Sequence, residues 1–168
     1  MIASSSPISV RVAGPHDSEA IRAIYNLEVS ESTVTFDLTP RTAADQHVWL
    51  EEHAGVHPAV VAVEGGSVVG FGSLSPYRPR PAYATTVEDS VYVRRDRQGR
   101  GVGRTVLNEL VDLATNHGFH AVMARIVDGH GASIALHRGC GFDLVGVERE
   151  VGRKFNRWLD VVVMQKLL

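Results

Sequence analysis

The chain has 168 residues, of which 44% are hydrophobic and 21% are charged, and this composition is typical of a soluble globular domain with a buried core. Its formal net charge of −2 argues against nucleic acid or a membrane surface as a partner. No apolar stretch is long enough to cross a bilayer, and residues 1–7 predict a flexible tail, not a signal peptide. The single cysteine, Cys140, fits the reducing environment of the cytoplasm.

The first half of the chain predicts a strand, two helices and a β-hairpin. Alternating apolar and polar residues indicate the strand, and apolar residues at helical spacing indicate the helices. Two apolar runs flank Gly65 and Gly66, and paired glycines accept the backbone angles of a tight turn. The predicted elements are a strand at 8–12, helices at 17–30 and 42–53, and strands at 59–63 and 68–74.

The second half alternates strands and helices after a loop at 76–81 that contains three prolines. The predicted elements are a strand at 85–93, a glycine-rich turn at 99–103, a helix at 102–116, a strand at 119–127, a helix at 132–138, and strands at 142–151 and 158–167. This order predicts a single α/β domain over residues 8–168, with one mixed sheet flanked by helices.

The segment from Gln98 to Arg104 carries the strongest functional signal in the sequence. It reads Gln-Gly-Arg-Gly-Val-Gly-Arg between a predicted strand and a predicted helix. Glycines permit positive φ angles, and their N–H groups can surround a diphosphate together with the helix N-terminus. Arg97, Arg100 and Arg104 would add full positive charges. A P-loop would need glycine in place of Gln98, and a dinucleotide fingerprint would need it in place of Arg104, so both common phosphate motifs fail.

The pattern Gln-Gly-x-Gly-x-Gly after a strand resembles the pyrophosphate loop of the GNAT superfamily of N-acetyltransferases. Residues 86–93, 132–142 and 151–160 resemble, more narrowly, the branch that acetylates phosphinothricin and methionine sulfoximine, and the resemblance covers almost the whole chain from Ile8. It implies the GNAT fold, whose twisted mixed sheet splays between its fourth and fifth strands, with acetyl-CoA in the opening and no metal. It also implies a homodimer.

The resemblance implies that acetyl-CoA contacts the strand before the loop, the loop itself and the helices that follow. The residues expected to bind it are Val91, Tyr92, Val93, Gln98, Gly99, Arg100, Gly101, Val102, Gly103, Arg104, His130 and Ser133. His130 stands where many members of the branch carry an asparagine, and an imidazole can still donate or accept a hydrogen bond there.

Acetyl transfer needs a base for the amine, a donor for the thioester oxygen and a proton for the leaving thiol. The resemblance implies that Glu88 is the base, and its neighbour Asp89 should raise its pKa; the alternative is an ordinary solvated acid. Asp89 also breaks the apolar alternation of the strand, which is compatible with a bulge. The resemblance implies such a bulge, which frees a backbone N–H near Tyr92 to hold the thioester oxygen.

His137 stands where many GNAT enzymes carry a tyrosine that protonates CoA. An imidazole could donate that proton or hold the amine, but a histidine at a helix end could instead bind the terminal carbonyl groups. An acyl-cysteine on Cys140 is disfavoured, because no base and orienting group accompany it in the sequence, and we read it as a small core residue.

The proline-rich loop before this strand carries Arg78 and Arg80, whose guanidinium groups could grip the carboxylate of an amino acid. The resemblance implies that this loop lines the substrate pocket together with the aromatic side chains of Phe36 and Tyr83. The alternatives are a solvated basic loop or a polyproline recognition segment for the arginines, and core positions for the two aromatic residues.

The sequence therefore predicts an N-acetyltransferase for the α-amino group of a small amino acid such as phosphinothricin or methionine sulfoximine. One alternative is an acetyltransferase for protein N-termini or ribosomal proteins, which would favour an open groove over an arginine-bearing loop. The other is a sensor that binds acyl-CoA without turnover.

Overall fold

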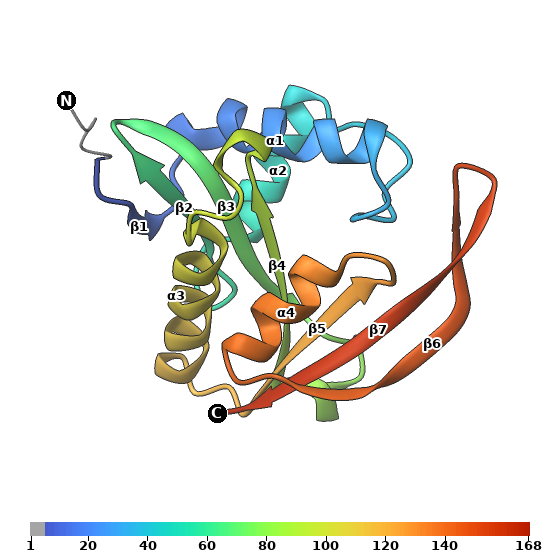
Figure 1. Cartoon of the computed structure of the whole chain (residues 1–168). Coiled ribbons are helices and arrows are strands. Elements are labelled where there is room, and N and C mark those ends of the chain that lie inside the picture. The colour runs from blue at the N-terminus through green and yellow to red at the C-terminus, as the bar shows by residue number, and fades with distance from the viewer. Residues whose placement is uncertain (1–5) are drawn as a thin grey trace.

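A seven-stranded mixed sheet runs through the molecule in the order β1-β2-β3-β4-β5-β7-β6 (Figure 1). The computed structural model describes residues 6–168, so most of the tail predicted at 1–7 lies outside the described residues. Neighbouring strands are antiparallel except for β4 and β5, which are parallel. The strands are β1 (Ser9–Val12), β2 (Ala59–Glu64), β3 (Ser67–Pro76), β4 (Thr86–Val93), β5 (Ala121–Val127), β6 (Asp143–Lys154) and β7 (Arg157–Leu167).

Helices cover both faces of this sheet. The described helices are α1 (Ser18–Glu31), α2 (Ala43–Glu52), α3 (Val102–Asn116) and α4 (Gly131–Gly139), with short 3-10 turns η1 (Pro15–Asp17), η2 (Pro81–Tyr83) and η3 (Arg95–Arg97). The predicted helices and strands are all found, and their ends move by no more than three residues. The expected mixed α/β architecture is therefore confirmed.

Local sequence accounts for where these elements begin and turn. Thr42 starts α2 with a capping box: its hydroxyl accepts from the N–H of Asp45 at 3.1 Å, and the Asp45 carboxylate accepts from the N–H of Thr42 at 2.9 Å. Gly65 and Gly66 join β2 to β3 with φ angles of 57° and 82°, which side chains rarely tolerate.

Two hydrophobic clusters sit on opposite faces of the sheet. The larger cluster joins α3, and part of α4, to the central strands; its buried members include Val60, Leu74, Val87, Leu107, Leu110, Phe142 and Met164. The smaller cluster joins α1 and α2 to β2, β3 and β4 around Ile21, Tyr25, Val61 and Phe71. Side chains that alternate along each central strand therefore find a core on either side.

The sheet opens between β4 and β5. Residues 86–88 pair with residues 121–123, after which β4 continues to pair with β3 and β5 with β7. Figure 1 shows the two strands leaving their common end in different directions. This divergence creates the opening that the resemblance implies.

The bulge predicted at Asp89 is not formed. Residues 87–93 of β4 pair with β3 in uninterrupted register. The prediction assumed that a charged residue breaks the buried side of the strand, but Asp89 is only 6% exposed. Because alternate residues of a strand face the same way, its side chain lies on the same face as those of Val87 and Val91.

Close contact between β3 and α3 gives a stability prediction. A Cβ added at Gly72 would lie 2.6 Å from Cγ1 of Val106 and 2.8 Å from the carbonyl oxygen of Ser90. Gly72→Ala should therefore lower the free energy of unfolding in urea by about 1–3 kcal/mol. A Cβ at Gly146 would meet nothing within 4 Å, so Gly146→Ala should change that free energy by less than about 0.5 kcal/mol. Similar losses in both variants would contradict this packing.

Candidate active site

A cavity of about 1010 Å³ occupies the opening between β4 and β5. The structure brings most of the predicted site residues to its wall. They are Phe36, Glu88, Val91, Tyr92, Val93, Gln98, Gly99, Gly101, Gly103, Arg104, His130, Ser133 and His137. The predicted residues outside the wall are Arg78, Arg80, Tyr83, Arg100 and Val102.

The glycine-rich loop turns its backbone toward the start of α3. Gly99 and Gly101 have φ angles of 73° and 86°, and the N–H of Thr105 makes the first bond of the helix, to the carbonyl of Gly101 at 3.0 Å. The N–H groups of residues 102–104 therefore have no acceptor within the helix. A Cβ on Gly103 would come within 3.1 Å of Leu136 on α4, so glycine is needed for this close approach. These amides can hold a diphosphate at the positive end of the helix dipole.

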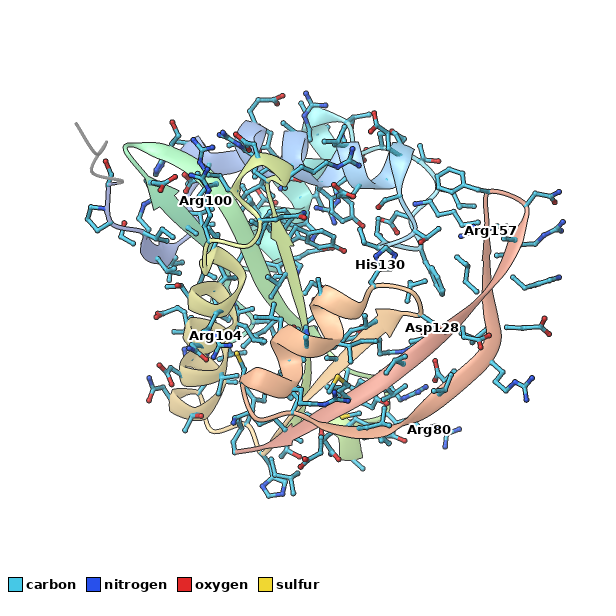
Figure 2. All side chains as sticks on the ribbon, viewed as in Figure 1. Arg80, Arg100, Arg104, Asp128, His130 and Arg157 are labelled. Carbon is cyan, nitrogen blue, oxygen red and sulfur yellow. The ribbon has the colours of Figure 1, made fainter. Side chains whose placement is uncertain are left out.

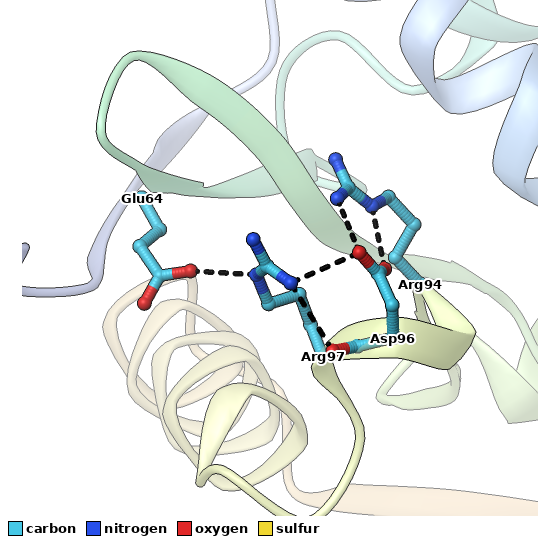
Figure 3. Close-up of polar contacts among 4 residues, drawn as sticks. All are labelled: Glu64, Arg94, Asp96 and Arg97. Carbon is cyan, nitrogen blue, oxygen red and sulfur yellow. Dashed lines mark hydrogen bonds and ion pairs between the residues drawn. The ribbon is translucent and has the colours of Figure 1, made fainter. Parts of the chain in front are cut away.

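Ion pairs hold the turn that precedes the loop (Figure 3). Arg94 and Arg97 bind the carboxylate of Asp96 at 2.7 and 2.9 Å, and Nε of Arg97 also donates to Glu64 at 2.9 Å. The hydrogen bonds from Arg94 lower the pKa of Asp96 to about 2. Arg97 was expected to add charge to the diphosphate site, but its guanidinium is committed to these acids.

Two other arginines flank the same loop (Figure 2). Arg100 lies on the loop itself, and Arg104 lies one turn into α3, where Nη1 donates to the carbonyl of Gly139 at 3.4 Å. Within residues 6–168, Arg100 forms no ion pair. Both cations remain available to an anion at the loop.

The free edge of β4 offers backbone donors to the cavity. The N–H of Arg94 donates to the carbonyl of Val69 on β3 at 2.9 Å. Since backbone groups alternate in direction along a strand, those of Tyr92 also point to β3, whereas those of Val91 and Val93 point toward the opening. The free N–H expected near Tyr92 thus belongs to Val91 or Val93. The Tyr92 ring itself stacks on Phe71, 5.2 Å between centroids.

Glu88 lies on the cavity wall and shares its face of the sheet with Tyr92. Burial raises the pKa of its carboxyl group, the charge of Arg125 opposes that rise, and the charge of Asp89 adds to it. A carboxylate with a raised pKa in a cleft is suited to accept a proton near neutral pH.

Asp89 and His137 form a buried pair that joins β4 to α4. Nε2 of His137 lies 2.9 Å from Oδ2 of Asp89, and Nδ1 donates to the carbonyl of Ser133 at 2.7 Å. Because both ring nitrogens face acceptors, each carries a proton and the imidazole is a cation. Burial alone would lower the pKa of His137, but the hydrogen bond and charge of Asp89 raise it above the ordinary value.

Contacts between distant segments border one side of the cavity. Nε2 of His130 lies 2.9 Å from the hydroxyl of Thr33, which follows α1, and Figure 2 shows His130 between α4 and that segment. Phe36 packs so tightly on Gly152 of β6 that a Cβ there would lie 2.2 Å from its ring. Nζ of Lys154 donates to the carbonyl of Thr35 at 2.9 Å. The β6–β7 hairpin and the α1–α2 connection therefore roof the site together.

The proline-rich loop lies further from the cavity than the sequence suggested. Arg78 is exposed, with its guanidinium 4.9 Å from the ring centroid of Tyr77. Arg80 is exposed as well and projects away from the ribbon in Figure 2. Tyr83 packs edge-on against Tyr77, 5.6 Å between centroids. Only Phe36 of the predicted substrate residues reaches the wall alongside Glu88.

Sequence reasoning missed three charged residues near the site. Asp89 was considered as a neighbour of Glu88 and as the cause of a bulge, whereas the structure shows that it binds His137. Arg125 lies on the cavity wall and forms an ion pair with Glu148 of β6. Arg125 could have been found from the sequence, because it is the one charged residue in the apolar run 121–127 and charged side chains are rarely buried in a strand.

The described residues 6–168 contain no group of three or more His, Cys, Asp or Glu side chains that could hold a metal ion. In the same range, every helix is too short or too polar to span a membrane.

A family comparison identifies the class of protein. The model of the acetyltransferase (GNAT) family matches residues 21–142. The chain therefore belongs to the GNAT family, and it is an N-acetyltransferase that takes its acetyl group from acetyl-CoA. The expected family, fold and cosubstrate are confirmed.

Individual relatives narrow the comparison. The chain is similar to the L-methionine sulfoximine/L-methionine sulfone acetyltransferase of Pseudomonas aeruginosa, with 41% identity over 159 residues that cover 94% of this chain and 92% of the relative. A phosphinothricin acetyltransferase from Sinorhizobium meliloti, solved in complex with AcCoA, shares 37% identity at a TM-score of 0.92 and covers 96% of this chain and 88% of its own. A ribosomal-protein-alanine N-acetyltransferase from Brucella melitensis shares 40% identity at a TM-score of 0.93, and the match covers 95% of this chain and 99% of the Brucella chain.

The buried ion pair gives a prediction that depends on pH. Since the pKa of His137 is raised in the folded state, the pair should stabilise the fold fully below about pH 6.5, and this contribution should fade as pH rises through the raised pKa. Asp89→Asn removes the charge, so the pKa of His137 should fall from its wild-type value, because only the hydrogen bond to the carbonyl of Ser133 then opposes burial. NMR titration of the His137 ring measures both values. A wild-type His137 that titrates below about 6.5 would contradict the assignment.

Proposed function

We propose that this enzyme acetylates the α-amino group of a small free amino acid of the phosphinothricin or methionine sulfoximine type. The observation that carries the proposal is the placement of Glu88 on the wall of the opening that also receives the glycine-rich loop. The substrates in the names of the Pseudomonas and Sinorhizobium relatives support the same class.

Glu88 acts as the general base in this proposal. A free amino acid is mostly ammonium at neutral pH, so a proton must leave the nitrogen before it can attack. Glu88, held unprotonated above its raised pKa, takes that proton directly or through a water molecule. Acetyl-CoA supplies a thioester whose carbonyl carbon bonds to the amine as the bond to sulfur breaks. The nitrogen then loses its second proton to water, which leaves the neutral amide.

The backbone of β4 stabilises the charge that develops on the thioester oxygen. The N–H groups of Val91 and Val93 face the opening and are fixed by the β3–β4 pairing, so they need no rearrangement to donate. The cationic His137 is the proton donor to the leaving thiolate in this proposal. Asp89 holds its Nε2–H, so the Nδ1–H leaves the carbonyl of Ser133 to reach the sulfur.

A second candidate function is acetylation of a protein N-terminus. The similarity to the Brucella ribosomal-protein-alanine acetyltransferase supports it. The roof that Phe36 and Lys154 form over the cavity disfavours it, because a polypeptide chain would have to pass beneath these contacts.

The chain assembles as a homodimer in this proposal. β6 is an edge strand of the sheet, and several large apolar side chains on it and on β7 are about half exposed or more. They are Leu144, Val145, Val147, Val151 and Trp158. An apolar edge of this kind is ordinarily covered by another chain. A cytoplasmic location stays a prediction from the sequence.

Replacing the base tests the mechanism. Glu88→Gln should lower kcat for methionine sulfone by roughly 10²–10⁴-fold, while the Kd for acetyl-CoA stays the same, because only the proton acceptor is lost. The wild-type kcat/KM should fall as pH falls through the raised pKa of Glu88, and the variant should lack this limb. A thiol-release assay measures the rates, with Glu51→Gln on the exposed face of α2 as the control. Unchanged turnover in Glu88→Gln would remove Glu88 as the base.

A further inference from the structure

The face of the sheet that bears Glu88 carries a charged and an apolar surface side by side. Glu88 pairs with Met123 across the β4–β5 ladder, and alternate residues place Arg125 on the same face as Met123. Pairing of β5 with β7 adds Val163 to this face. Met123 and Val163 belong to one buried apolar cluster. Glu88 and Arg125 therefore lie on one face of the sheet, on the two strands that diverge, and both line the cavity.

Arg125 is placed and charged to hold an anion. Its side chain is about one third exposed, lines the cavity and forms an ion pair with Glu148, which reaches it from β6 across β7. Within the described residues, Glu148 is its ion-pair and hydrogen-bond partner. A guanidinium has five N–H donors in a planar fork, so one carboxylate leaves donors free for a second.

A free amino acid complements this surface. It carries an ammonium group and a carboxylate on one carbon atom, and Glu88 and Arg125 offer the opposite charges on the wall of one cavity. Among the cations near Glu88, Arg125 also lowers the pKa of that carboxyl group most. Arg78 and Arg80, by contrast, lie outside the cavity wall.

We propose that Arg125 binds the α-carboxylate of the acceptor. Glu148 orients the guanidinium of Arg125, whose remaining N–H groups donate to the substrate. This inference rests on the proposed function and names the residue that recognises the α-carboxylate of the acceptor. Amines without a carboxylate, α-carboxamides and protein N-termini place a neutral group or none at Arg125, so they lose a charge-assisted bond.

Two ligands that differ only at the carboxylate test the proposal. Titration calorimetry of the CoA-bound enzyme with L-methionine sulfone and with its α-carboxamide gives two Kd values for each variant. Arg125→Met should weaken binding of the acid by on the order of tenfold or more and leave the carboxamide unchanged. Arg125→Lys should recover part of the loss, because it keeps the charge but not the fork.

Arg149→Met is the matched control, since Arg149 is an exposed neighbour of Glu148 with no hydrogen bond to another described side chain. It should alter neither Kd, and an unchanged Kd for CoA shows that each variant is folded. Equal weakening of acid and carboxamide in Arg125→Met would overturn the proposal, as would loss of the acid preference in Arg78→Met alone. Normal turnover and KM for methionine sulfone in Arg125→Met would overturn it while leaving the proposed function intact. Failure of wild-type enzyme to bind the acid would contradict both.

Discussion

The short pairing between β4 and β5 is the constraint on which the rest of the site depends. Backbone bonds join the two strands over residues 86–88 and 121–123 and then stop. Continued pairing would consume the edge of β4 and close the sheet. Instead the strands diverge, the start of α3 and the glycine-rich loop flank the opening, and the amides of Val91 and Val93 remain free to donate. One irregularity in an otherwise regular sheet thus provides both the cavity and the free backbone donors that our proposal assigns to the thioester oxygen.

Strand alternation divides the chemistry between two faces. Glu88 and Asp89 are adjacent in sequence, yet their side chains leave β4 in opposite directions. Asp89 meets His137 on α4 and stays fully buried, whereas Glu88 faces the cavity beside Arg125. In our proposal, this arrangement separates Glu88, the base for the incoming amine, from His137, the cation that serves the departing sulfur. Burial raises the pKa of Glu88 and would by itself lower the pKa of His137. The hydrogen bond and charge of Asp89 outweigh burial at His137 and raise its pKa.

Periodicity, caps and glycines in the sequence were enough to predict the elements and the loop, because those signals are local. The capping box at Thr42 and the Gly65–Gly66 turn are examples, and the resemblance implied the splayed sheet. The role of Glu88 as the base stays a proposal. Contacts between distant segments could not be predicted, because they leave no local pattern in the sequence. The prediction of a bulge at Asp89 was wrong. His137, whose hydrogen bond stabilises the buried carboxylate, lies 48 residues away in the sequence, so no local pattern pointed to it. The Arg125–Glu148 pair depends on β7 lying between β5 and β6, and no local pattern reveals that strand order.

A crystal structure of the enzyme with acetyl-CoA tests the central claim most directly. The account predicts diphosphate oxygens within hydrogen-bond distance of the N–H groups of residues 101–104, and the thioester carbonyl at the N–H of Val91 or Val93, with Glu88 on the side open to the amine. A cofactor bound outside the β4–β5 opening, or a thioester separated from Glu88 by the sheet, would contradict it.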